Sequence, residues 1–126
     1  MNMPEDRLEL LLKRFSVAAL AHHEALEDMD DVRAAAQYRM LSGLYQSLLR
    51  EGAQGEAGLL TLLDSPHHPV AGMAAVYCLI HHPERCLAVL REVANVPGLL
   101  GFRASVAIER WENGTWEHPV TVAEKE

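Results

Sequence analysis

The sequence predicts an all-α protein of about six helices packed as antiparallel hairpins. Apolar residues recur every three or four positions through most of the 126 residues, which is the spacing of one helix face. No segment alternates apolar and polar residues as a strand does. The boundaries of the periodic segments carry helix-breaking residues; they are Pro66, Pro69, Pro83, Pro97, Gly52, Gly55 and Gly114. We expect one domain over residues 1–114, followed by a polar, loosely held tail over residues 115–126, in which Trp116 could fold back against the domain.

The first helix is expected over residues 4–27. Pro4 suits a first helical turn, as do the carboxylates that follow it. The apolar residues of this segment share one helix face; they are Leu8, Leu11, Leu12, Phe15, Ala18, Ala19 and Leu26. This face is predicted to pack on the rest of the protein.

A second long helix should follow after a short acidic turn. Asp30 or Asp31 is placed to cap its first turn, and its apolar positions extend from Val32 to Leu49. Gly52 then provides a stop. Because only a short turn joins the two long helices, we expect them to pack antiparallel.

Four shorter helices are expected in the second half of the chain, over residues 56–63, 70–81, from Pro83, and from Pro97 to about residue 113. Proline suits the first helical position and disfavours helix in the residue before it. No residue between 70 and 80 is charged. A helix without a polar face is usually surrounded by other elements, so the second of these four, over residues 70–81, is predicted to be the central helix.

Part of this layout resembles HEAT repeats, which stack helical hairpins. The segment of residues 62–70 (LLDSPHHPV), followed by Ala74, Ala75 and Leu79, resembles the second helix of such a unit. Ala71 stands where HEAT units commonly carry an arginine. The resemblance implies a HEAT-like α-α superhelix.

The whole chain resembles a bacterial family catalogued as a domain of unknown function, number two thousand and nineteen in that catalogue. The resemblance covers about residues 8–119. It rests on residues 10–15 (LLLKRF), the turn of residues 22–31, residues 62–64 (LLD), the His82-Pro83 break and residues 111–114 (WENG). It implies the same HEAT-like fold and no catalytic residues.

Charge and hydropathy exclude two classes of partner. Eleven Lys and Arg stand against eighteen Asp and Glu, a formal charge of −7, which repels the phosphates of nucleic acid. The uncharged run of residues 70–80 is much shorter than the roughly 20 residues of a membrane-spanning helix. The chain opens on acidic residues after Pro4 and not on a basic, then apolar, signal sequence. We therefore expect a cytoplasmic protein.

No enzyme motif is recognisable. His22-His23-Glu24 is not the His-Glu-x-x-His of metalloproteases, because Glu27 occupies the place of the second histidine. The serines lack a Gly-x-Ser-x-Gly setting, and the glycines near residues 52–55 lack the lysine of a phosphate-binding loop. The sequence predicts neither catalysis nor a cofactor.

A metal site formed by Cys78, His82 and Cys86, with His81 in place of His82 as a variant, is an alternative hypothesis. Cysteine and histidine at positions i, i+3 and i+4 share a helix face and are typical zinc ligands. Buried cysteine is also common in apolar helices, and histidine suits helix junctions. We favour packing for the thiols and keep metal binding or metal sensing as the alternative.

The acidic turn is the predicted recognition element. Five carboxylates occur within eight residues: Glu24, Glu27, Asp28, Asp30 and Asp31. Such a run can serve helix capping and solvation, or it can dock a partner protein that has a basic surface. The leading hypothesis is a protein-interaction module, with an immunity or antitoxin-like role as one form of it.

Overall fold

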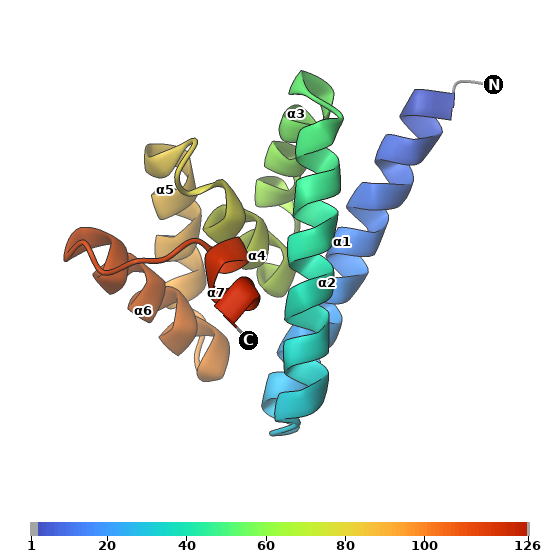
Figure 1. Ribbon diagram of the computed structural model, residues 1–126. Helices are drawn as coiled ribbons and strands as arrows, with labels where there is room; N and C mark the ends of the chain where they lie inside the picture. Colours follow the sequence, from blue (N-terminus) through green and yellow to red (C-terminus); the bar gives the residue numbers. More distant parts are fainter. Residues whose placement is uncertain (1–2, 126) are drawn as a thin grey trace.

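The computed structural model describes residues 3–125 and is helical throughout this range, without a strand (Figure 1). This confirms the predicted all-α class. The helices are α1 (Met3–Glu27), α2 (Asp31–Arg50), α3 (Ala53–Thr61), α4 (His68–Cys78), α5 (Pro83–Ala94), α6 (Leu99–Glu112) and α7 (Pro119–Lys125), and a 3-10 turn (Leu62–Asp64) joins α3 to α4.

The first hairpin packs α1 against α2 over most of their length, antiparallel as predicted (Figure 1). Its inner face buries Phe15 and Ala19 of α1 against Leu41 and Leu48 of α2. Burying a large apolar side chain contributes about 1.5–3 kcal/mol. This hairpin is therefore a substantial part of the hydrophobic core.

Helix α4 lies at the centre of the molecule, between the first hairpin and the pair α5–α6 (Figure 1). Ala74 and Ala75 are fully buried, because small side chains let neighbouring helices approach closely. The central position agrees with the prediction from the uncharged segment. The helix ends at Cys78, before the predicted residue 81, and leaves Ile80 half exposed in the following turn.

The turn between α5 and α6 depends on two glycines. Gly98 has φ of +92°, a conformation that favours glycine. A Cβ at Gly101 would overlap the carbonyl oxygen of Val96. Helix α6 therefore begins at Leu99 and not at Pro97.

The C-terminal segment differs from the loosely held tail that we expected. The backbone N–H groups of Thr115 and Trp116 donate to the carbonyl of Arg110, and Trp116 packs edge-on against Trp111. Pro119 is buried and opens α7, which lies against α2. The segment is held because Trp116 and Val120 pack against the hydrophobic core of the domain.

A buried polar network ties this segment to the core. Tyr77 Oη lies 2.7 Å from Ser42 Oγ, and Tyr45 Oη lies 2.9 Å from His81 Nε2. His118 Nε2 donates to the carbonyl of Tyr77 at 3.1 Å, and its ring contacts both tyrosine rings. Burial raises the pKa of Tyr45 to about 12. Each polar side chain has a partner, so the network has a structural role.

Within residues 3–125, none of the helices combines the length and the apolar character needed to cross a membrane.

Candidate functional site

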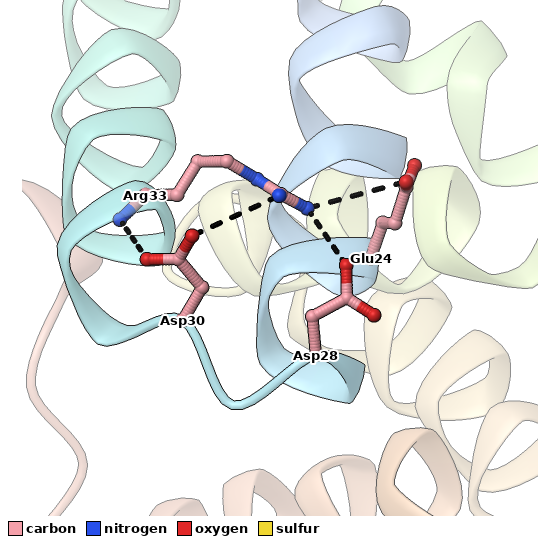
Figure 2. A network of polar contacts seen from close by, with 4 residues as sticks. All are labelled: Glu24, Asp28, Asp30 and Arg33. Carbon is pink, nitrogen blue, oxygen red and sulfur yellow. Dashed lines mark hydrogen bonds and ion pairs between the residues drawn. The ribbon is translucent and has the colours of Figure 1, made fainter.

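The acidic turn connects α1 to α2 and is organised by a single cation (Figure 2). Arg33 Nη2 lies 3.2 Å from Asp28 Oδ2 and 4.0 Å from Glu24 Oε1. Its Nη1 lies 3.8 Å from Asp30 Oδ2. Three of the five predicted carboxylates therefore converge on one guanidinium, which the sequence analysis did not anticipate.

Asp30, and not Asp31, is the cap of α2. Its Oδ1 accepts a hydrogen bond of 3.0 Å from the backbone N–H of Arg33. Asp31 lies in the first turn of α2, where the helix dipole favours a negative charge. The remaining carboxylate, Glu27, has Oε1 3.1 Å from His23 Nε2. The structure thus brings all five carboxylates to one end of the first hairpin, in different local roles.

Two apolar side chains stand exposed among these carboxylates. Met29 is 87% exposed and Val32 is 81% exposed. Met29 also has φ of +57°, a left-handed conformation that costs a non-glycine residue about 1–2 kcal/mol. We call residues 24–33 the hairpin tip; it has five carboxylates and one arginine around an apolar pair.

A cavity of about 640 Å³ opens beside the hairpin tip. Its walls come from α1, α2, α4, α5 and α6, and from residues 115–122. The polar side chains on it include His22, His23, Tyr38, Arg103 and Arg110. None of these residues was selected as a site from the sequence.

His22 is a buried histidine at this cavity. It is only 5% exposed, and its ring stacks on Tyr38 with centroids 5.5 Å apart. Burial, then the charge of Arg103 and the neighbouring His23, lowers the pKa of His22 to about 4. His22 is therefore neutral at pH 7.

The alternative metal ligands do not converge. Cys78 and Cys86 are both buried and free, and a hydrogen bond with Cys86, together with burial, raises the pKa of the Cys78 thiol. His82 Nε2 instead lies 2.8 Å from Glu56 Oε1, and His81 bonds to Tyr45. No group of three or more His, Cys, Asp or Glu side chains that could hold a metal ion occurs in the described part of the chain.

This geometry predicts the metal content. Protein purified without a histidine tag should contain well under one zinc ion per chain by elemental analysis, because the thiols and imidazoles face different partners. A chelator should leave the melting temperature unchanged. Stoichiometric zinc that disappears when Cys78 and Cys86 are both changed to serine would contradict this prediction.

Comparisons of the chain with protein-family models, with curated proteins and with solved structures find no match. The HEAT-like superhelix and the resemblance to the bacterial family therefore stay predictions from the sequence. The candidate sites are therefore assigned from the positions and contacts of this chain's own residues.

Proposed function

We propose that this chain is a non-enzymatic protein-interaction module that binds a basic partner protein through its hairpin tip. The observation that supports this proposal most directly is the exposure of Met29 and Val32 in the same short turn region as five carboxylates. Large exposed apolar side chains rimmed by charge are typical of protein contact surfaces.

The contacts of Arg33 fit this role. By holding Glu24, Asp28 and Asp30 close together, Arg33 reduces the side-chain entropy that binding would otherwise remove. Neighbouring carboxylates repel each other by a few tenths of a kcal/mol per pair, and a basic partner replaces part of this repulsion by attraction. A basic toxin or nuclease domain has the required surface, in agreement with the immunity-like role suggested by the sequence.

The test reverses charge at the tip without removing the helix cap. In the double variant Glu24→Lys/Glu27→Lys, Asp30 still caps α2 and Asp28 still pairs with Arg33. The matched control is Glu92→Lys/Glu112→Lys, which makes the same charge change at exposed positions of α5 and α6. A partner cross-linked to the parent protein through a probe at Met29 would be identified, purified and titrated against all three proteins.

We expect the tip variant to bind that partner about tenfold or more weakly, since like charges meeting across an interface cost several kcal/mol. The control should bind within about twofold of the parent protein. Association with the parent should slow as salt rises from low to physiological concentration, because exposed charges are screened beyond about 8–10 Å. Equal binding of the tip variant at every salt concentration would exclude the tip as the docking surface.

A further inference from the structure

The cavity holds a cation, Arg103, that takes part in none of the ion pairs formed among the described residues. Arg103 of α6 is half buried at its wall, and burial lowers its pKa; an arginine nevertheless stays protonated in proteins. The electrostatic neighbour of Arg103 among the described residues is Tyr38, which lies on the wall of the same cavity. Native proteins pair the charges that they bury, because an unpaired one is costly.

A polar group without a hydrogen-bond partner lies on the wall of the same cavity. Nδ1 of the buried His22 has no hydrogen-bond partner among the described residues. The charge of Arg103 is one of the causes that lower the His22 pKa, so the two side chains lie within electrostatic range. The cavity thus offers a fixed positive charge and a neutral imidazole, contributed by α6 and α1.

The rest of the wall suits an apolar body. Met73, Val76, Leu100 and Trp116 line the same cavity. Its volume of about 640 Å³ lies within the roughly 300–1,000 Å³ that is usual for small-molecule sites. Arg110 follows Arg103 by seven residues, two helical turns along the same face of α6, and lies on the wall of the cavity.

We propose that this cavity binds a small organic monocarboxylate with an apolar body, its carboxylate on Arg103 beside His22 and its body against the apolar wall. A guanidinium matches a carboxylate with two parallel hydrogen bonds. The charged side chains on the wall are Arg103, Arg110 and Glu117, two cations and one carboxylate. Their net charge of +1 balances a single negative charge, which favours a carboxylate over a phosphate dianion. This site is separate from the protein contact proposed for the hairpin tip, and neither depends on the other.

The test uses 8-anilinonaphthalene-1-sulfonate, a fluorescent probe that joins an anionic group to an apolar ring system. The folded protein should bind one probe per chain, and octanoate should displace it. Octanol, with a similar chain and no charge, and inorganic phosphate, with charge and no chain, should not displace it at the same concentration. Displacement by octanol equal to that by octanoate would contradict the anion site, as would the absence of probe binding.

Arg103→Gln should weaken octanoate binding by about tenfold or more, because it removes a charge-assisted pair of hydrogen bonds. The matched control Arg91→Gln, at an exposed position of α5, should change binding by less than twofold. Arg103→Lys keeps the charge and loses the two parallel hydrogen bonds. Its affinity for octanoate should therefore lie between that of the parent protein and that of Arg103→Gln. Circular dichroism and melting curves would establish that each variant is folded, since the probe also binds unfolded apolar surface.

NMR spectroscopy detects octanoate binding without the fluorescent probe. In the parent protein, octanoate should shift the NMR signals of the His22 ring and leave those of His68, which lies exposed on the first turn of α4, unchanged. An unshifted His22 signal at saturating octanoate, or equal octanoate binding by folded Arg103→Gln and the parent protein, would overturn the proposal.

Discussion

Ala75→Glu is expected to lower the free energy of unfolding by about 4 kcal/mol or more, which is a large part of the roughly 5–15 kcal/mol that stabilises an ordinary domain. Ala75 is fully buried on α4, the helix that contacts both the first hairpin and α5. A larger side chain there overpacks the core, at a cost of about 1–3 kcal/mol. An unpaired carboxylate inside the core adds a further cost of several kcal/mol, or raises its own pKa and becomes neutral.

Chemical denaturation followed by circular dichroism measures this effect. The matched control is Ala36→Glu, which introduces the same side chain at an exposed position of α2 and should change stability by about 0.5 kcal/mol or less. A denaturation midpoint of Ala75→Glu equal to that of the parent protein would mean that α4 is not the central helix.

The central helix could be predicted from the sequence because its evidence is local. A run without charge between two prolines indicates a buried helix whatever its neighbours are. The position of its end could not be predicted with the same certainty. His82 has φ of −140° and ψ of +65°, a non-helical conformation favoured by Pro83, and the turn before it already begins after Cys78.

The held C-terminal segment was not predictable because its partners are distant in the sequence. His118 bonds to the carbonyl of Tyr77, 41 residues earlier, and only the fold brings them together. The local composition around His118 is polar and gives no sign of this contact. Trp116 was the one local signal, and it packs against the domain.

The two candidate sites also differ in whether their residues are close together or far apart in the sequence. The hairpin tip is continuous in the sequence, so its five carboxylates were found, but the role of Arg33 needs the geometry of the turn. His22 and Arg103 line the same cavity although most of the chain lies between them in the sequence. The sequence alone therefore offered no reason to pair them. A signal was present in α6, where Arg103 lies on the same helix face as Leu100 and Ala107, because a charged residue on an apolar face is unusual.

The protein is expected to lose about 2 kcal/mol of stability between pH 7 and pH 5 because of His22. Its pKa is lowered from 6.5 to about 4 in the folded protein, by burial first, whereas the unfolded chain binds a proton near pH 6.5. Between these values the unfolded state holds more protons than the folded state, so the free energy of unfolding falls as pH falls. The loss begins below pH 6.5 and is complete near pH 4. Burial also lowers the pKa of His118, which acts in the same direction.

Denaturant unfolding at several pH values between 5 and 7 separates the contribution of His22 from that of the carboxylates, most of which ionise below this window. His22→Gln removes the titrating ring and keeps a polar side chain, so its stability should depend less steeply on pH than that of the parent protein. His68→Gln replaces an exposed histidine and should keep the parent slope. If His22→Gln and the parent protein lose stability in parallel from pH 7 to pH 5, then burial and the charge of Arg103 do not hold His22 neutral in the folded state.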